Sequence, residues 1–209
     1  YKFVNGKGYF TLSHQNVNVA NFNLPMIGRH NIQNATSVAV MGLKLGLTTQ
    51  EIQEGFHTFK GIKRRQEVLG VKNGVTVIDD FAHHPTAIQL TLEGIKEAYP
   101  GQRIWAIFEP RSATCKRKVF EDRLPKSFTP ADLVIIADLF APDKIDPKDR
   151  LNPELVVENI NNDGGDAYFI PDTEALINKL ITECRPKDVL LIMSSGGFSG
   201  IHQKLIARL

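Results

Sequence analysis

The sequence has 209 residues, 42% of them hydrophobic and 23% charged, with a formal net charge of +2. This balance produces no strong electric field, which argues against nucleic acid or an anionic membrane as the main partner. The two cysteines, Cys115 and Cys184, lack metal-site spacing and are too few for a disulfide scaffold, which favours a reducing cytoplasm. No apolar run approaches the roughly 18 residues of a membrane span. Because the chain starts at Tyr1 directly in strand-like sequence, we expect a fragment of a longer protein. The sequence does not indicate an oligomeric state.

The first sixty residues predict two strands followed by two helices. Apolar residues alternate in 9–12 and 17–24, and the polar turn SHQN between them indicates a hairpin or two edge strands. Helical spacing then runs through 28–46, where Gly46 is a candidate C-cap. A second helix over 48–59 is expected to begin at Thr48 or Thr49 and to end near Gly61.

Beyond Gly61 the sequence alternates between buried strands and helices. Segments 66–71 and 75–80 flank KNG, a hairpin signal. The strands that follow are nearly continuous apolar runs, which is typical of a parallel sheet covered on both faces. We therefore predict an α/β, Rossmann-like, mostly parallel domain over 63–209, preceded in 1–62 by the strands and helices of another domain's tail. The expected helices are 85–98, 115–124, 154–160, 172–184 and one at the C-terminus, and the strands are 103–109, 132–138, 167–170 and 188–193.

Polar clusters follow four of the predicted strands. Asp79 and Asp80 end one strand, EPRSAT follows the next, Asp138 ends a third, and SSGGFSG follows the last. In a parallel sheet, ligands bind at the carboxyl ends of the strands. The sequence therefore predicts a ligand site at this edge.

The stretch VIDDFAHHPT, residues 77–86, is open to three interpretations. A metal site could use Asp79, Asp80, His83 and His84, but adjacent histidines on extended chain point to opposite sides. Alternatively, His84 caps the helix that Pro85 begins and the aspartates face solvent. A strand-end carboxylate can also accept hydrogen bonds from ribose hydroxyls, a role that suits Asp80.

Three further motifs offer binding chemistry beside a structural alternative. SSGGFSG, residues 194–200, is either an anion site before a helix or merely a turn, and Arg111 could help it by holding a carboxylate with two hydrogen bonds. The charged run KRRQE, residues 63–67, is either a solvated face or a source of one arginine that stacks on a purine or contacts phosphate. Asn31 could cap a helix or, like Asn34, bind adenine through its amide.

Three of these motifs, GRHNIQNA, GIKRRQE and DDFAHHPT, occur in this order and spacing. Together they resemble the end of the central domain and the whole C-terminal domain of the Mur ligases, the ATP-dependent amide-forming enzymes of peptidoglycan. HHPT is similar to the branch that uses UDP-N-acetylmuramate. EPRSAT and MSSGGFSGIHQKL resemble the murein peptide ligases of that branch, which attach the tripeptide L-alanyl-γ-D-glutamyl-meso-diaminopimelate in peptidoglycan recycling. The L-alanine-adding enzymes instead have a loop closer to QPHR followed by threonine.

The resemblance implies roles for residues that match the family's motifs. Asn31 and Asn34 would contact adenine, Arg65 would complete this ATP site, and Asp80 would bind the ribose. The catalytic residues His83 and His84 would lie near the γ-phosphate and the reacting centre, with the choice between them left open. The two loops would hold the incoming peptide through Glu109, Arg111, Ser112, Thr114, Ser194, Ser195, Gly196, Gly197, Phe198 and His202.

The resemblance also implies parts that lie upstream of Tyr1. These are the phosphate-binding glycine-lysine loop, most Mg²⁺ ligands, a modified lysine and the uridine-nucleotide domain. Residues 1–209 alone are therefore expected not to turn over ATP, UDP-N-acetylmuramate and tripeptide. The alternatives are an L-alanine ligase of peptidoglycan biosynthesis, a non-catalytic nucleotide- or peptide-binding α/β module, and a metal-dependent hydrolase built on residues 79–84.

Overall fold

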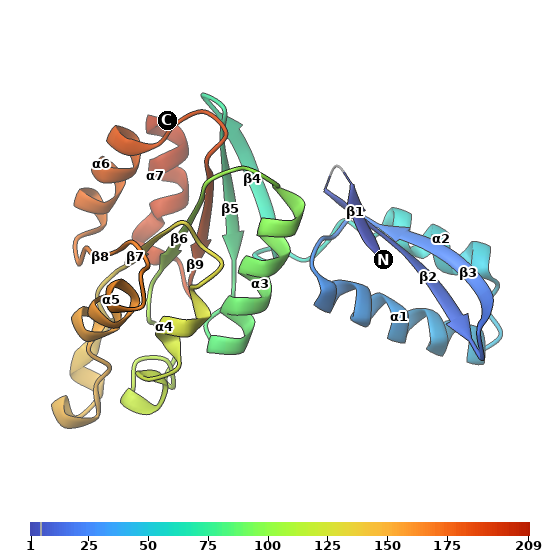
Figure 1. Cartoon of the computed structure of the whole chain (residues 1–209), viewed down its shortest axis with the longest axis horizontal. Coiled ribbons are helices and arrows are strands. Elements are labelled where there is room, and N and C mark those ends of the chain that lie inside the picture. The colour runs from blue at the N-terminus through green and yellow to red at the C-terminus, as the bar shows by residue number, and fades with distance from the viewer. Residues whose placement is uncertain (5) are drawn as a thin grey trace. The chain divides into compact units, whose positions relative to one another are not determined.

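A computed structural model describes residues 1–4 and 6–209 (Figure 1). The chain divides into two compact units. The first comprises residues 1–63 with 93–100, and the second comprises 64–92 with 101–209.

The first unit begins with a three-stranded antiparallel sheet in the order β1-β2-β3. Its strands are β1 (Lys2–Val4), β2 (Lys7–His14) and β3 (Val17–Leu24). The predicted hairpin is confirmed, and its turn is formed by Gln15 and Asn16, both with positive φ (49° and 63°). Such two-residue turns match the twist of the flanking strands. Strand β1 was not predicted, because only three residues form it.

Two helices cover one face of this small sheet (Figure 1). Helix α1 (Arg29–Lys44) ends just before Gly46, whose φ of 91° fits the predicted C-cap position. Helix α2 (Thr49–Thr58) is capped by Thr48, which forms a capping box with Glu51. It ends earlier than predicted, because Phe59 is already extended. The core between helices and sheet contains Phe10, Phe22, Leu24, Ile32, Ala35, Ala39, Ile52 and Phe56.

The second unit is built on a six-stranded sheet in the order β4-β5-β9-β6-β7-β8. Only the edge strand β4 is antiparallel to its neighbour, so the predicted mostly parallel α/β fold is confirmed. The strands are β4 (Glu67–Lys72), β5 (Val75–Asp80), β6 (Ile104–Phe108), β7 (Leu133–Ile136), β8 (Ala167–Phe169) and β9 (Val189–Met193).

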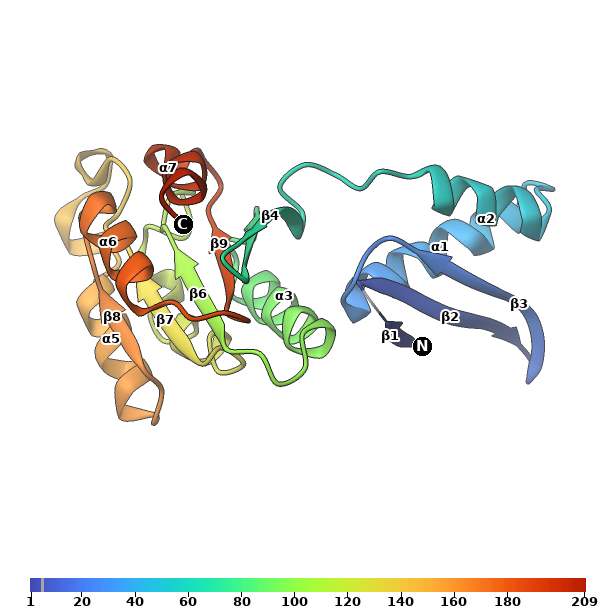
Figure 2. The same cartoon turned by 90° about the horizontal axis from the view of Figure 1, so that it is seen from above.

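Helices cover both faces of this sheet. On one face, α6 (Thr173–Glu183) and α7 (Ile201–Arg208) pack on alternate strand residues such as Trp105 and Leu190. Residues 85–92 of helix α3 (Pro85–Ala98), which belong to this unit, lie on the opposite side of the sheet from α7 (Figure 2). Helix α5 (Pro153–Asn162) lies beside β8. Among the described residues, no helix has the length and apolarity needed to cross a membrane.

The predicted helix 115–124 is wrong. The segment instead contains turns, a short 3₁₀ turn η1 (Lys118–Phe120) and, beyond them, the one-turn helix α4 (Leu124–Ser127). Arg117 interrupts the helix because its backbone is extended (φ −109°, ψ 154°) and forms a bridge with Arg150. A tertiary contact therefore overrides the local helical preference.

Candidate functional site

The carboxyl ends of three strands meet because β9 lies between β5 and β6. The pairing continues past the strand ends, since the Ser194 N–H donates to the Asp80 carbonyl (3.2 Å) and the Glu109 N–H donates to the Met193 carbonyl (3.1 Å). The loops that follow β5, β9 and β6 are thus side by side. The predicted grouping of the first, second and fourth polar clusters is correct within this unit.

Arg64 ties two of these loops together. Its Nη2 donates to the carbonyls of Ser194 and Gly196, at 2.6 Å each, and its Nε lies 3.3 Å from Asp79 Oδ2. Its backbone has φ +60°, which is uncommon for a residue with a side chain. Arg64 therefore fixes the loop after β9, and its guanidinium is largely used for this structural task.

Arg111 is held differently. Its guanidinium carbon lies 3.4 Å from the centre of the Phe140 ring, and its Nη1 lies 3.6 Å from Glu109 Oε2. On another side it lies against Gly196, where an added Cβ would come within 1.9 Å of Arg111 Nε. Within residues 1–4 and 6–209 its guanidinium makes no hydrogen bond, although 25% of the side chain is exposed. Its N–H donors thus remain available to a ligand.

Glu109 connects Arg111 to the loop after β9. The buried Glu109 carboxylate accepts a hydrogen bond from Ser194 Oγ (2.5 Å). Ser194 Oγ in turn accepts one from the Gly196 N–H (2.9 Å). This chain of contacts fixes the two loops that were predicted to hold a peptide.

Asp80 is deeply buried, with 3% of its surface exposed. Its two carboxylate oxygens accept hydrogen bonds from the N–H groups of Ala82 (2.7 Å) and Gln66 (2.8 Å). Burial raises the pKa of Asp80, against the lowering effect of these two hydrogen bonds and of Arg65. Each oxygen keeps a second lone pair, so the carboxylate could still accept a ribose hydroxyl. Arg65 is exposed and lies 5.2 Å from the centre of the Phe81 ring.

The two adjacent histidines have different surroundings. His84 lies at the start of α3, where its carbonyl accepts the Ile88 N–H (2.9 Å) and its Nδ1 accepts the Thr86 N–H (3.2 Å). It is thus a helix cap, and its ring also packs edge-on against Phe120. His83 Nδ1 lies 2.9 Å from the Phe81 carbonyl, which makes it the donor and leaves Nε2 as the acceptor in the neutral ring. His83 is therefore the better candidate for contact with a reacting group.

Replacing His84 by alanine should lower the free energy of unfolding by about 1 kcal/mol, because a cap and an aromatic contact are both lost. His84→Asn keeps a cap acceptor and should recover part of this loss. Chemical denaturation of the two variants would measure the difference. An alanine variant as stable as the unchanged chain would contradict the capping role.

The remaining predicted residues divide by exposure. In the first unit, Asn31 is buried and donates from Nδ2 to the Ile27 carbonyl (2.7 Å), whereas Asn34 is exposed on α1. In the second unit, Phe198 belongs to the hydrophobic core, so only its backbone could meet a ligand. His202 is also buried, with Nε2 3.1 Å from Asp79 Oδ1. The residues that are exposed or half-buried at the loops are Ser112, Thr114, Ser195, Gly196 and Gly197.

The metal interpretation of residues 79–84 finds no support in the geometry. In the described part of the chain, no group of three or more His, Cys, Asp or Glu side chains is placed to hold a metal ion. Asp79 instead contacts Arg64 and His202, and Asp80 binds backbone N–H groups. A hydrolase built on this cluster is therefore disfavoured.

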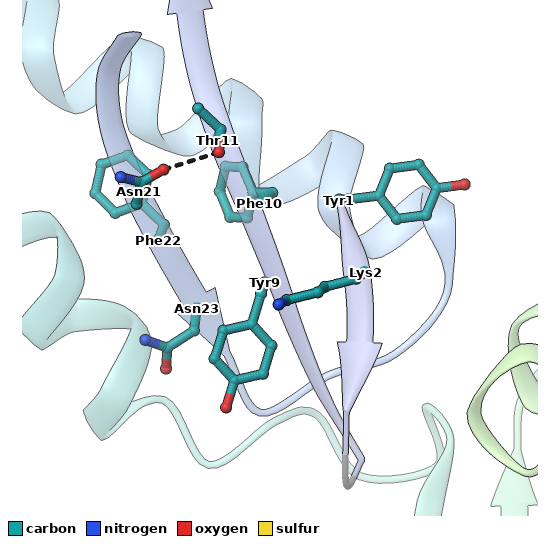
Figure 3. Close-up of a pocket in the computed structure, with 8 residues that line it drawn as sticks. All are labelled: Tyr1, Lys2, Tyr9, Phe10, Thr11, Asn21, Phe22 and Asn23. Atoms are coloured by element: carbon teal, nitrogen blue, oxygen red, sulfur yellow. Dashed lines mark hydrogen bonds between the residues drawn. The ribbon is translucent and has the colours of Figure 1, made fainter.

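Two hollows lie outside the strand-end cluster. One, of about 450 Å³, lies on the small sheet of the first unit and is lined by β1, β2 and β3, with Thr11 hydrogen-bonded to Asn21 at its side (Figure 3). The other, of about 400 Å³, lies between α3 and α4 and is lined by Pro85, Thr86, Gln89, Asp122, Arg123, Lys126 and Ser127. None of the predicted site residues lines either hollow.

The sequence did not indicate two members of the cluster, Arg64 and Phe140. Arg64 stands next to Arg65 in the basic run, and only its contacts distinguish the two. Phe140 follows β7 closely and remains 43% exposed. An exposed aromatic residue just after a strand end was the available signal for it.

Comparison with known proteins agrees with these motifs. The family model described as "Mur ligase, glutamate ligase domain" matches residues 64–196. A UDP-N-acetylmuramate–L-alanine ligase of Acetivibrio thermocellus is 34% identical over 92% of this chain and 40% of its own length. A UDP-N-acetylmuramate–L-alanyl-γ-D-glutamyl-meso-2,6-diaminoheptandioate ligase of Haemophilus influenzae is 32% identical over 100% of this chain and 44% of its own length.

A solved structure gives the same result. The murein peptide ligase of Psychrobacter arcticus matches 98% of this chain and 42% of its own with a TM-score of 0.67 and 32% identity. The chain thus spans less than half the length of these three relatives. Because the family model covers more than half of the chain, the chain belongs to the Mur ligase family.

Proposed function

We propose that this chain serves in an ATP-dependent ligase that joins UDP-N-acetylmuramate to the tripeptide L-alanyl-γ-D-glutamyl-meso-diaminopimelate in peptidoglycan recycling. Residues 1–62 would then belong to the central ATP-binding domain, and 63–209 would form the C-terminal domain. The main support is Arg111, which is fixed in orientation at the carboxyl edge of the sheet yet keeps unused N–H donors. The Haemophilus and Psychrobacter ligases are similar to this chain over nearly its whole length, and their names support the tripeptide as the acceptor.

The proposed reaction solves a leaving-group problem. A carboxylate does not condense with an amine in water at a useful rate, because oxide would have to leave. The muramate carboxylate therefore attacks the γ-phosphorus of ATP, which forms an acyl phosphate and ADP. The α-amine of the tripeptide then attacks the acyl carbon, loses a proton and displaces inorganic phosphate. Rate acceleration in such steps comes mainly from positioning and neutralisation of charge.

In this proposal the residues of the C-terminal domain position the acceptor. Arg111 holds a carboxylate of the peptide, and the backbone of residues 195–197 lines the same place. Glu109 and Ser194 act by fixing Arg111 and the loop after β9.

The nucleotide contacts form a second part of the proposal. Within the second unit, Arg65 and Asp80 are the proposed nucleoside contacts, with Asp80 accepting a ribose hydroxyl. Within the first unit, Asn31 and Asn34 are the proposed adenine contacts, and the Asn31 amide also donates to the Ile27 carbonyl. His83 would lie near the γ-phosphate and the reacting centre, where it would present Nε2, the ring nitrogen that the Phe81 carbonyl does not use. Bound Mg²⁺ would neutralise the phosphates.

An L-alanine ligase of peptidoglycan biosynthesis is the second candidate. The Acetivibrio relative, which is 34% identical over 92% of the chain, supports it. L-alanine also carries a carboxylate and an α-amine, so Arg111 could serve either acceptor. The two candidates differ in the acceptor and share the chemistry at the acyl phosphate.

The acceptor can be tested in the full-length ligase. Phosphate release would be measured with ATP, Mg²⁺ and UDP-N-acetylmuramate, and either the tripeptide or L-alanine as acceptor. We expect release that depends on both muramate and tripeptide. Release with L-alanine alone would establish the second candidate, and release with neither would leave a non-catalytic binding module.

A further inference from the structure

Phe140 has an unusual set of contacts for an exposed aromatic residue. Its ring covers one face of the Arg111 guanidinium at 3.4 Å, and its backbone N–H donates to the carbonyl of Pro110 (3.1 Å), the neighbour of Arg111. At the same time 43% of its surface remains exposed. Phe140 is thus attached to the Arg111 segment through both its backbone and its side chain.

A buried lysine fixes the backbone on the other side of Phe140. Lys116 is 6% exposed, and its Nζ donates to the carbonyls of Phe140 (2.8 Å) and Ala141 (3.4 Å). Ala141 has φ +48°, a conformation that non-glycine residues adopt infrequently. Among the described residues, Lys116 pairs with no carboxylate, so its buried ammonium needs such carbonyl acceptors. Lys116 therefore holds the backbone that carries the Phe140 ring.

We propose that Phe140 is a positioning residue of the acceptor site, which acts by holding the Arg111 guanidinium in one plane. The ring lies against one face of the guanidinium, and Gly196 lies so close to Arg111 that no side chain fits there. Glu109 lies beside Nη1 at 3.6 Å. These three contacts restrict the directions from which a ligand can approach the guanidinium.

This arrangement selects the chemical class of ligand. A guanidinium edge matches the two oxygens of a planar carboxylate with two parallel hydrogen bonds. A flexible arginine side chain loses conformational entropy when it binds a ligand. Fixing the guanidinium plane before binding removes much of this cost. The inference rests on the proposed function, but it holds for the tripeptide and for L-alanine, because both carry the required carboxylate.

The test compares Phe140→Leu with Phe140→Tyr in the full-length ligase. Leucine keeps apolar bulk but removes the aromatic face, so KM for the acceptor should rise about 3- to 30-fold with little change in kcat. Tyrosine keeps the face and should restore KM. Tyr168→Leu is the matched control, because Tyr168 stacks with Lys179 (3.9 Å) and is similarly exposed, at 37%, but belongs to β8 outside the site. It should leave KM unchanged.

A double-mutant cycle separates positioning from a general effect on folding. If Phe140 acts through Arg111, adding Phe140→Leu to Arg111→Ala should cause no further rise in KM. An equal rise in both backgrounds, or no rise in Phe140→Leu alone, would overturn the proposal.

The geometry can also be tested without turnover. In the 209-residue chain, ring current from Phe140 should shift the Arg111 Nε–H proton resonance upfield. Phe140→Leu should remove this shift and Phe140→Tyr should keep it. A resonance that Phe140→Leu does not move would overturn the stacking. A full-length protein that accepts neither the tripeptide nor L-alanine, together with an intact shift, would contradict the proposed function and leave the stacking in place.

Discussion

Replacing Arg111 by alanine is expected to raise KM for the acceptor about 10- to 100-fold in the full-length ligase. The variant loses two charge-assisted hydrogen bonds to a carboxylate, each of which contributes on the order of 1.5–3 kcal/mol when made to a charged group. The two are not additive, so a loss near the value for one bond is the realistic expectation. Initial rates of phosphate release at saturating ATP and UDP-N-acetylmuramate would measure the change.

Two variants control for the loss of positive charge. Arg111→Lys keeps the charge but not the two parallel donors, so it should recover only part of the affinity. Arg117→Ala removes an arginine whose half-exposed side chain pairs loosely with Asp149 (3.9 Å), and it should leave KM unchanged. If Arg111→Ala and Arg117→Ala behaved alike, Arg111 would not bind the acceptor.

Replacing Asp188 by alanine is expected to lower the free energy of unfolding of the second unit by about 3 kcal/mol. The buried Asp188 carboxylate accepts hydrogen bonds from Arg103 Nη2 (2.6 Å), Trp105 Nε1 (3.0 Å) and the Arg185 N–H (3.0 Å). The substitution leaves the buried indole N–H of Trp105 without its acceptor. Denaturant unfolding followed by Trp105 fluorescence would give the value, because Trp105 is the only tryptophan.

The contribution of Asp188 to the free energy of unfolding should depend on pH. Burial raises the pKa of Asp188, but the hydrogen bonds from Arg103, the Arg185 backbone and Trp105 together hold this pKa below its usual value. A carboxylate with a lowered folded pKa contributes stability above its unfolded pKa of about 3.9, and this contribution is lost as pH falls through the folded pKa. The stability difference from Asp188→Asn should therefore be largest near neutral pH and should shrink below about pH 4.

A matched surface carboxylate provides the control. Asp149 is half-exposed and forms a loose ion pair with Arg117 at 3.9 Å, so Asp149→Ala should change stability by less than about 1 kcal/mol. A stability difference for Asp188→Asn that stays constant from pH 7 to pH 3 would contradict the proposed pH dependence.

Local sequence patterns were sufficient for most of the secondary structure. Alternating apolar residues and a two-residue polar turn predicted the β2–β3 hairpin, and Pro85 marked the start of α3 correctly. These signals succeed because turn geometry and helix starts depend on a few neighbouring residues. The helix predicted over 115–124 failed because the backbone of Arg117 pairs with Arg150, a residue far along the chain.

The strand-end clusters could likewise be recognised from the order of the residues, since every parallel strand presents its carboxyl end at one edge. Which clusters become neighbours depends on strand order, and no local pattern encodes that β9 inserts between β5 and β6. That insertion brings Glu109, Ser194 and Arg64 together. In the resulting site, the Arg64 guanidinium binds backbone carbonyls of the loop after β9. The N–H donors of Arg111 remain available to a ligand, and Phe140, from the segment after β7, covers its guanidinium. The sequence motifs were sufficient to identify the residue types of the site. Which residue stabilises the loops and which remains free to bind a ligand depends on contacts between segments distant in sequence, and only the folded chain defines these contacts.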